Sequence, residues 1–326
     1  MFLGGVMEYI KKAAKTAESD TEKIRSIVQG ILSDIEKNGE DAVIKLAKKF
    51  DNWDADFILS EEKKQRLIAT VPENIKQDIR FAHEQVHGFA KLQRDSIQEF
   101  EKETLPGVRL GQRIIPMEVA GCYIPGGRFA HACSALMSVA TAKAAGVETV
   151  IACSPPRGDS IAPAVVYALD VAGADIIIEM GGVQAIATMA FGLFTGKPAN
   201  ILAGPGNAYV AEAKSILSSA GKCTIDVFAG PTESAIIADK TADYMTVAVD
   251  LVSQAEHGYD SPVWLFTDSR VLGEKVLEVI PKIIADMPNP EVPETAWRDY
   301  GEIVLCRDRE DLCRVNDTYA AEHVQV

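Results

Sequence analysis

The middle of the chain reads Asp175-Ile176-Ile177-Ile178-Glu179-Met180-Gly181-Gly182-Val183-Gln184-Ala185-Ile186-Ala187. The short run of β-branched residues before the glycine pair predicts a buried strand, and the apolar run from Val183 to Phe191 predicts a helix. Two glycines between them allow a tight turn. A strand, a glycine turn and a helix in this order make up half of a βαβ unit, which predicts a parallel sheet.

The same alternation of strand and helix continues on both sides of this stretch, from Pro106 to the end of the chain. Residues 1 to about 105 instead have helical spacing of apolar residues, including a long polar helix from Glu73 to Glu103. The repeated units are enough for two parallel sheets. The predicted strands are 113–124, 149–154, 175–180, 200–203, 225–228, 234–238, 263–267 and 303–306.

Composition limits the classes of protein and the partners that fit this chain. The 326 residues are 47% hydrophobic and 25% charged, which is ordinary for a globular protein. The net charge of −14 argues against nucleic acid or an anionic membrane as partner, because phosphate binding needs clustered Lys and Arg. No signal peptide or membrane-spanning run is evident. The six cysteines show no C-x-x-C pair, so we expect free thiols in the cytoplasm.

The predicted polar helix contains a short metal-binding pattern. His83-Glu84-Gln85-Val86-His87 matches the H-E-x-x-H pattern of zinc peptidases, with two histidines one turn apart. The extended form of that pattern fails, because Ala90 and Gln93 occupy the positions of its glycine and third histidine. A solvated helix face is the preferred interpretation of the stretch, and a zinc peptidase that uses His83-Glu84-x-x-His87 is the alternative function.

Glycine turns follow several predicted strands, where open α/β sheets bind ligands. Gly204-Pro205-Gly206-Asn207 begins like a dinucleotide fingerprint, but Tyr209 replaces its third glycine. As a nucleotide motif it is therefore weak, and a generic tight turn fits equally well.

A predicted helix from Thr241 to His257 ends in Ser253-Gln254-Ala255-Glu256-His257-Gly258. Thr241 is a candidate N-cap and Gly258 a candidate C′ residue. Gln254 and His257 are three residues apart and share one face of the last turn. They could be half of a metal site, or His257 could simply interact with the helix C-terminus. The residues alone favour the second interpretation, because two ligands do not make a zinc site.

The order of the motifs resembles the histidinol dehydrogenase family from about residue 105 onward. The matching stretches are Gly121-Cys122-Tyr123-Ile124-Pro125-Gly126-Gly127, Ala142-Lys143-Ala144-Ala145-Gly146-Val147, Gly181-Gly182-Val183-Gln184-Ala185-Ile186-Ala187, Gly204-Pro205-Gly206-Asn207, Asp226-Val227-Phe228-Ala229-Gly230-Pro231-Thr232-Glu233, Ser253-Gln254-Ala255-Glu256-His257 and Tyr319-Ala320-Ala321-Glu322-His323.

The resemblance implies a role for each matching residue. It implies that Gln254 and His257 bind zinc and substrate, and that Glu322 and His323 are the catalytic acid–base pair, His323 also contacting substrate. Thr232 stands where the family usually has a substrate-contacting serine. The residues implied to bind NAD are Tyr123, Gln184 and Asn207.

The implied reaction oxidises a primary alcohol through the aldehyde to the carboxylate, with two NAD reduced. Zinc would stabilise the developing alkoxide, an imidazole would take the alcohol proton, and a glutamate would activate water. Hydride transfer is the cofactor's own chemistry.

One segment departs from the usual family pattern. Residues 128–137, with 192–198 and 257–262, look more like the sulfopropanediol dehydrogenase branch. Arg128 and His131 at a predicted helix start would favour an anionic substrate group such as a sulfonate, whereas histidinol is a cation. Arg128 could equally face solvent or a cofactor phosphate. Sulfopropanediol is the preferred substrate and L-histidinol the second.

The chain stops at Val326, soon after the Glu-His pair. The resemblance places an aspartate and a histidine zinc ligand, and a further substrate-contacting glutamate, in a later part that also swaps into the partner of a homodimer. We therefore expect weak zinc binding and little turnover from these residues alone.

Pattern and resemblance together predict an α/β protein with two interleaved Rossmann-like domains, parallel sheets and an N-terminal helical arm. The predicted boundaries are 1–20 for the arm, 21–124 with 234–326 for the first domain, and 125–233 for the second.

Overall fold

The computed structural model describes residues 8–15, 21–126, 131–227 and 232–326, and it divides into two compact units. The large unit spans residues 20–229, and the small unit combines residues 1–19 with 230–326. One unit is therefore inserted into the sequence of the other. The division differs from the predicted boundaries, which grouped residues 21–124 with 234–326. The reason is that Val119–Tyr123 is the central strand of the large unit's sheet, and the preceding helices pack against that sheet.

The large unit is built on a five-stranded sheet in the order β6-β5-β4-β7-β8, with every neighbouring pair parallel. In chain order this is 3-2-1-4-5, the arrangement of a Rossmann-like fold. The order reverses between β4 and β7, so the crevice expected to bind ligands lies beyond the ends of these two strands. The strands are β4 (Val119–Tyr123), β5 (Thr149–Ser154), β6 (Ile176–Glu179), β7 (Ile201–Ala203) and β8 (Thr224–Ile225).

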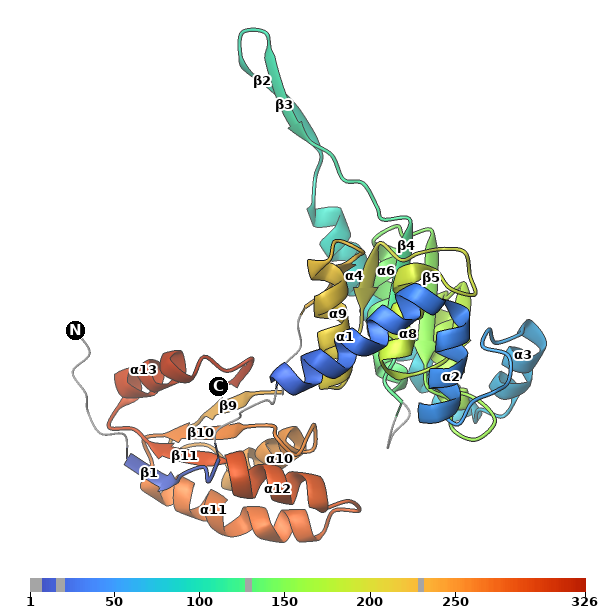
Figure 1. Cartoon of the computed structure of the whole chain (residues 1–326). Helices are drawn as coiled ribbons and strands as arrows, with labels where there is room; N and C mark the ends of the chain where they lie inside the picture. The colour runs from blue at the N-terminus through green and yellow to red at the C-terminus, as the bar shows by residue number, and fades with distance from the viewer. Residues whose placement is uncertain (1–7, 16–20, 127–130, 228–231) are drawn as a thin grey trace. The chain divides into compact units, whose positions relative to one another are not determined.

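Helices cover both faces of this sheet, as Figure 1 shows. Successive residues of each strand point to opposite faces of the sheet. Cys122 on β4 pairs with Ala152 on β5, so Cys153, the next residue, faces the other side. The two cysteines therefore belong to different apolar clusters. One cluster contains α1 (Thr21–Asn38), α2 (Glu40–Phe50), α8 (Gly182–Phe191) and α9 (Ala208–Ser219). The other contains α3 (Glu61–Ala69), α4 (Glu73–Ser96), α7 (Pro163–Ala172) and a continuous helical run of α5 (Ala132–Ala135), the π-helical η1 (Leu136–Ala140) and α6 (Thr141–Ala144).

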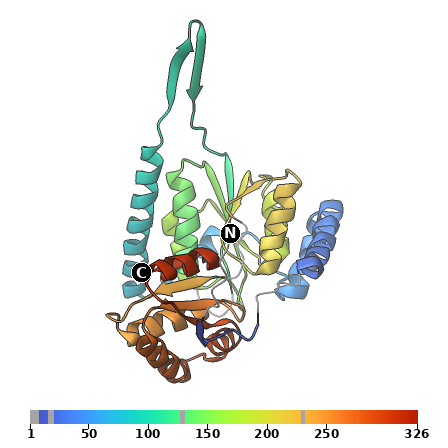
Figure 2. The ribbon, with the colours of Figure 1, turned by 90° about the vertical axis from the view of Figure 1, so that its left-hand side faces the viewer.

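The predicted helix 73–103 is shorter in the structure. It ends at Ser96, and β2 (Phe100–Leu105) and β3 (Val108–Gln112) form an antiparallel ribbon beyond it. The turn contains Pro106 and Gly107, whose φ of +79° suits glycine. The ribbon extends away from the rest of the large unit (Figure 1, Figure 2), and all of its strand residues are exposed.

The small unit has a five-stranded sheet in the order β1-β11-β10-β9-β12. Its last four strands are parallel in chain order 3-2-1-4, so the topology of the large unit recurs. The elements are β9 (Ser234–Ile237), α10 (Tyr244–Ala255), β10 (Val263–Thr267), α11 (Arg270–Ala285), α12 (Glu291–Tyr300), β11 (Glu302–Leu305), α13 (Arg309–Tyr319) and β12 (His323–Gln325). Helices α10, α11 and α12 share one apolar cluster, and α13 packs on the other face.

The expected N-terminal helical arm is wrong for residues 8–11, which form strand β1 (Glu8–Lys11) antiparallel to β11. Pairing with the sheet edge outweighs the local helical preference of this short segment. The helical N-terminal region begins at Thr21. Among the described helices, none is both long and apolar enough to cross a bilayer.

Candidate functional site

The helix that contains Gln254 runs from Tyr244 to Ala255, slightly shorter than predicted. Its N-cap is Asp243, whose side chain accepts the Met245 N–H at 2.9 Å, and not Thr241, which bonds to Asp239. His257 lies just past the helix end, and its N–H donates to the Gln254 carbonyl at 3.3 Å.

The first residue of β9 joins two of the predicted site residues. The Ser234 hydroxyl donates to Gln254 Oε1 at 3.1 Å. His323 pairs with Ser234 in the register between β12 and β9, and its N–H donates to the Glu233 carbonyl at 3.0 Å. Gln254 and His323 are 69 positions apart in the numbering, yet both contact the start of β9.

Glu322 and His323 form an exposed pair at the start of β12. His323 Nε2 lies 3.7 Å from Glu322 Oε2, and both side chains are more than half exposed. Thr232 is half-buried and stands two residues before Ser234. The small unit therefore gathers Thr232, Gln254, Glu322 and His323 around the start of one strand, with His257 next to Gln254.

This cluster lies at the amino ends of β9 and β12, which is the opposite edge from the one that the rule for open sheets favours. A depression of about 450 Å³ does lie at the carboxyl edge, lined in part by Ala238, Asp268 and Arg309. None of the predicted site residues lines it.

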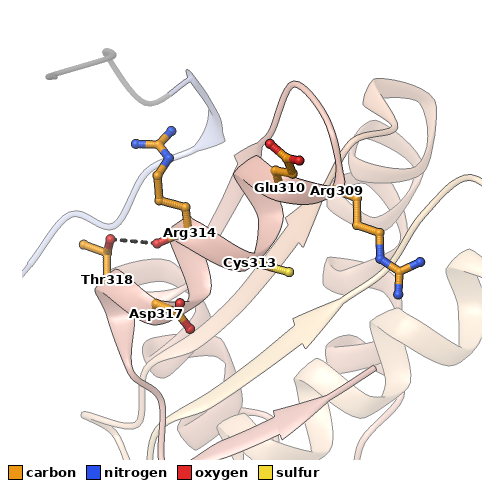
Figure 3. A pocket seen from close by; sticks show the side chains of 6 residues that line it. All are labelled: Arg309, Glu310, Cys313, Arg314, Asp317 and Thr318. Carbon is orange, nitrogen blue, oxygen red and sulfur yellow. Dashed lines mark hydrogen bonds between the residues drawn. The ribbon is translucent and has the colours of Figure 1, made fainter. Parts of the chain in front are cut away.

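Another depression, of about 1060 Å³, is open and lies on the outer face of α13 (Figure 3). The side chains drawn there extend from one helix, and Thr318 donates to the Arg314 carbonyl at 2.8 Å. No predicted site residue lines it. The lining residues are Arg309, Glu310, Cys313, Arg314, Asp317 and Thr318.

In the large unit, Tyr123 ends β4 at the point where the strand order reverses. It is 5% exposed, and its phenol oxygen accepts the Gly182 N–H at 3.1 Å. Burial raises the pKa of Tyr123 to about 12, because a phenolate would lose its hydration there.

Gln184 follows the Gly181-Gly182 turn and is only 2% exposed. Its side-chain amide donates to Asp51 Oδ2 at 3.1 Å, and the same oxygen accepts the Gly181 N–H at 3.1 Å. Asp51 therefore holds both the turn and Gln184. Sequence reasoning missed it, because Asp51 follows α2 and has no local signal linking it to a glycine turn 130 residues later.

The turn after β7 lies against Tyr123. A Cβ on Gly204, whose φ is +117°, would lie 2.0 Å from the Tyr123 carbonyl oxygen. Only glycine fits this position. Asn207 caps α9, and its side-chain oxygen accepts the N–H groups of Tyr209 and Val210, both at 3.1 Å.

An ion pair between a buried lysine and a partly exposed aspartate supports this turn and was also missed. The Lys214 ammonium donates to the Gly204 carbonyl at 3.0 Å and to Asp226 Oδ1, and Asp226 Oδ2 accepts the Gly204 N–H at 2.8 Å. Asp226 belongs to a quoted motif, but Lys214 lies on an apolar helix and is 2% exposed.

The structure describes only one of the two predicted anion-binding residues. Arg128 lies outside the described residues. His131 is half-buried and immediately precedes α5, where its carbonyl accepts the Ala135 N–H at 3.3 Å.

The H-E-x-x-H stretch lies in the middle of α4. The rings of His83 and His87 stack with centroids 5.5 Å apart, and burial lowers the pKa of His83. Across the described ranges, no three His, Cys, Asp or Glu side chains are grouped to hold a metal ion. The peptidase alternative therefore gains no support from the described residues.

Comparison with known proteins identifies relatives along the whole chain. The family profile for histidinol dehydrogenase matches residues 14–326. Sulfopropanediol 3-dehydrogenase of Ruegeria pomeroyi is 52% identical over 323 residues, which are 98% of this chain and 74% of that protein. Histidinol dehydrogenase of Methanothermobacter thermautotrophicus is 35% identical over 97% of this chain and 74% of its own length.

A solved structure agrees with these sequence matches. Histidinol dehydrogenase of Elizabethkingia anophelis superposes with a TM-score of 0.87 at 32% identity, covering 97% of this chain and 72% of that one. The α/β fold with parallel sheets is thereby confirmed. A family profile over almost the whole chain, relatives above 30% identity and this shared fold lead to one conclusion: the chain belongs to the histidinol dehydrogenase family.

Proposed function

We propose that this member of a dehydrogenase family is a zinc- and NAD-dependent enzyme that oxidises a primary alcohol through the aldehyde to a carboxylate, reducing two NAD. The observation that carries the proposal is the clustering of Gln254 and His323 at Ser234. Membership of the histidinol dehydrogenase family suggests the activity, and this clustering brings two of the residues implied to act in it to one strand end. Homodimerisation and action in the cytoplasm belong to the same proposal.

His323 is proposed to take the alcohol proton on a ring nitrogen. Imidazole suits this transfer near neutral pH. The backbone of His323 is held by the Glu233 carbonyl, while its ring is exposed enough to meet a substrate. Glu322, 3.7 Å away, would accept a proton from the water that adds to the aldehyde.

Gln254 Oε1 and a ring nitrogen of His257 would hold the zinc. Both atoms are acceptable zinc donors, and the Ser234 hydroxyl already orients the Gln254 amide. When bound, zinc polarises the substrate oxygen as a Lewis acid. Zinc sites generally use three or four protein ligands. Gln254 and His257 would therefore form part of the zinc site.

NAD would bind beyond the carboxyl ends of β4 and β7, where the strand order reverses. Gly204 and Gly206 let the turn after β7 pack tightly, since a Cβ would lie 2.0 Å from the Tyr123 carbonyl oxygen and 2.4 Å from Val210 Cγ1 respectively. The N-terminus of α9, capped by Asn207, would attract the pyrophosphate. Bound NAD supplies the hydride acceptor. Gln184, being buried and bonded to Asp51, would act mainly by shaping the Gly181-Gly182 turn.

The proposed preferred substrate is a sulfonate-bearing diol of the sulfopropanediol kind. The 52% identity to a protein named sulfopropanediol 3-dehydrogenase supports this choice. Arg128 and His131 would contact the sulfonate. L-Histidinol is the second candidate, because histidinol dehydrogenases are also relatives, at 35% identity.

The test follows NADH formation at 340 nm with sulfopropanediol and with L-histidinol, each with added zinc. It uses the 326-residue chain and, if longer, the whole gene product. We expect His257→Ala and His323→Ala to reduce turnover at least a hundredfold. His83→Ala is the matched control and should keep activity and zinc. Loss of zinc with His83→Ala alone would overturn the proposal.

A further inference from the structure

Tyr319 is the last residue of α13, and Glu322 follows three positions later. The Tyr319 ring lies on strand β10, with its centroid 4.9 Å from those of Trp264 and Phe266 and its edge turned toward both. Edge-to-face aromatic pairs are favourable and restrict the direction of the ring. The ring therefore holds the end of α13 on the sheet of the small unit.

The phenol group of Tyr319 reaches a buried carboxylate. It donates to Glu302 Oε2 at 2.6 Å, and Glu302, the first residue of β11, is 8% exposed. Burial raises the pKa of Tyr319, and the bond to Glu302 raises it further, so the phenol keeps the proton that it donates. This bond joins the end of α13 to the start of β11.

The same carboxylate also binds the N-terminal segment. Glu302 Oε1 accepts the Ala13 N–H at 3.1 Å. The hydroxyl oxygens of Tyr9 and Tyr319 are 3.2 Å apart, and Tyr9 is the donor because the Tyr319 proton is directed at Glu302. Tyr9 lies on β1, which pairs with β11 (Figure 1). Three segments that are distant in the sequence therefore meet at Glu302.

Further contacts fix the N-terminal segment where it passes Glu302. The Lys15 N–H donates to the Asp299 carbonyl at 2.8 Å, and the Lys15 ammonium lies 2.7 Å from the Asp299 carboxylate. The Lys11 ammonium donates to the Gly301 carbonyl. The segment is therefore anchored both before and after its bond to Glu302.

The connection from Tyr319 to His323 is short and constrained. Ala320 has a φ of +50°, a left-handed conformation that residues other than glycine rarely adopt. Its N–H donates to the Asn316 carbonyl at 2.8 Å. Such a conformation persists where surrounding contacts hold the chain on both sides. Here Tyr319 holds one side, and the pairing of His323 with β9 holds the other.

Strand pairing alone gives Glu322 and His323 a limited hold. Strand β12 has three residues, all of them exposed, and it lies at the edge of the sheet beside β9. Segments with few buried contacts and exposed backbone hydrogen bonds open more readily than the core of a sheet. The pair therefore benefits from a second anchor, and the end of α13 is the nearest one along the chain.

We infer that Tyr319 is a positioning residue for the Glu322–His323 pair and acts through its bonds to Glu302 and Tyr9. The inference rests on the proposed catalytic role of Glu322 and His323. Without the hydroxyl, the end of α13 and the connection to His323 would shift, and the imidazole would spend less time where it can take the alcohol proton. A misplacement of about 1 Å can lower a rate about a hundredfold.

The kinetic test compares Tyr319→Phe with the wild type in the NADH assay, using the 326-residue chain and, if longer, the whole gene product. We expect kcat to fall at least about tenfold, while KM for the alcohol and for NAD changes less than about threefold. Glu302→Ala should have the same effect. Glu302→Gln should restore most of the rate, because its amide can still bond to both Tyr319 and Ala13. Tyr300→Phe is the matched control, since the Tyr300 hydroxyl has no hydrogen bond within the described ranges.

Nuclear magnetic resonance of the imidazole rings tests the inference without turnover. The chain has five histidines, and loss of one signal in His323→Asn identifies the His323 ring in protein that contains isotope-labelled histidine. In Tyr319→Phe and Glu302→Ala, the His323 signal should shift and broaden, while the signals of the other histidines stay unchanged. Thermal unfolding checks that each variant is folded at the temperature of measurement.

An unchanged His323 signal in Tyr319→Phe overturns the inference, and so does an unchanged kcat in an enzyme whose wild type is active. Shifts of all five histidine signals overturn it as well, because the hydroxyl would then serve the stability of the whole chain. A wild type that oxidises neither alcohol refutes the proposed function instead, and the His323 signal still decides whether Tyr319 positions the ring.

Discussion

Replacing Asp226 with alanine is expected to destabilise the large unit strongly, although its side chain is 33% exposed. The carboxylate faces the Lys214 ammonium, whose side chain is 3% exposed. It also accepts the N–H groups of Gly204 at 2.8 Å and of Val227 at 2.7 Å. Removing it leaves a buried cation without its counter-ion and two backbone donors without their acceptor.

The magnitude follows from this geometry. Breaking a buried pair by removing one partner costs about 3–5 kcal/mol. Because water reaches one side of Asp226, we take the lower end, about 3 kcal/mol. Lys214→Met should cost only about 1–2 kcal/mol, since the remaining carboxylate still accepts its two backbone bonds and is partly hydrated. The double variant should therefore cost at least about 1 kcal/mol less than the sum of the two.

Urea unfolding can isolate the large unit by tryptophan fluorescence. Trp53 lies in the large unit and is 5% exposed, whereas Trp264 and Trp297 lie in the small unit. A background of Trp264→Phe and Trp297→Phe leaves one reporter, which avoids treating two units as a single transition. The reasoning is refuted if Asp226→Ala changes the free energy of unfolding by less than about 1 kcal/mol, or if the two effects are additive.

Three further outcomes are expected. Gly204→Ala should abolish NAD binding and lower the unfolding midpoint, because the alanine Cβ would lie 2.0 Å from the Tyr123 carbonyl oxygen. A variant that binds NAD and unfolds like the wild type, both measured by calorimetry, would contradict this close approach. Burial raises the pKa of Tyr123 to about 12, so the neutral phenol stabilises the fold fully below about pH 10 and less as pH rises to 12. Tyr123→Phe should reduce the loss of unfolding free energy between pH 9 and pH 12, measured by urea titration. An equal dependence of the unfolding free energy on pH in both proteins would contradict this prediction. With a thiol reagent, Cys133 and Cys313 should react rapidly in the folded chain, because both are exposed. The four buried cysteines should react only after unfolding, because burial keeps their thiols protonated. Rapid reaction of more than two thiols in the folded chain would contradict the described packing.

Much of the large unit was predictable, because its strands and helices are specified by local apolar runs and glycine turns. The stretch from Asp175 to Phe191 forms strand β6, a glycine turn and helix α8, as its pattern predicts. The helix 73–103 was predicted too long, because Phe100 to Glu103 are compatible with both structures and their pairing with residues 109–112 decides between them. Residues 8–11 were predicted helical for the same reason, since β11 is almost 300 residues away.

The candidate site was only partly predictable. Gln254 and His257 were found together because helical spacing places them on one face. Glu322 and His323 were proposed from resemblance to a family. Ser234 and Asp51 were not proposed at all, since an ordinary serine and an aspartate after a helix have no distinguishing pattern.

The sequence by itself determined the fold class, the family and the chemical types available at the site, because these depend on local patterns and on the identities of residues. Only the tertiary structure decided that residues 20–229 form one unit, that His323 meets Ser234 through strand pairing, and that the Lys214–Asp226 pair holds the turn at Gly204. These facts depend on contacts between distant segments. Such contacts are set by burial and by the pairing of strand edges, and no local periodicity encodes which edges meet.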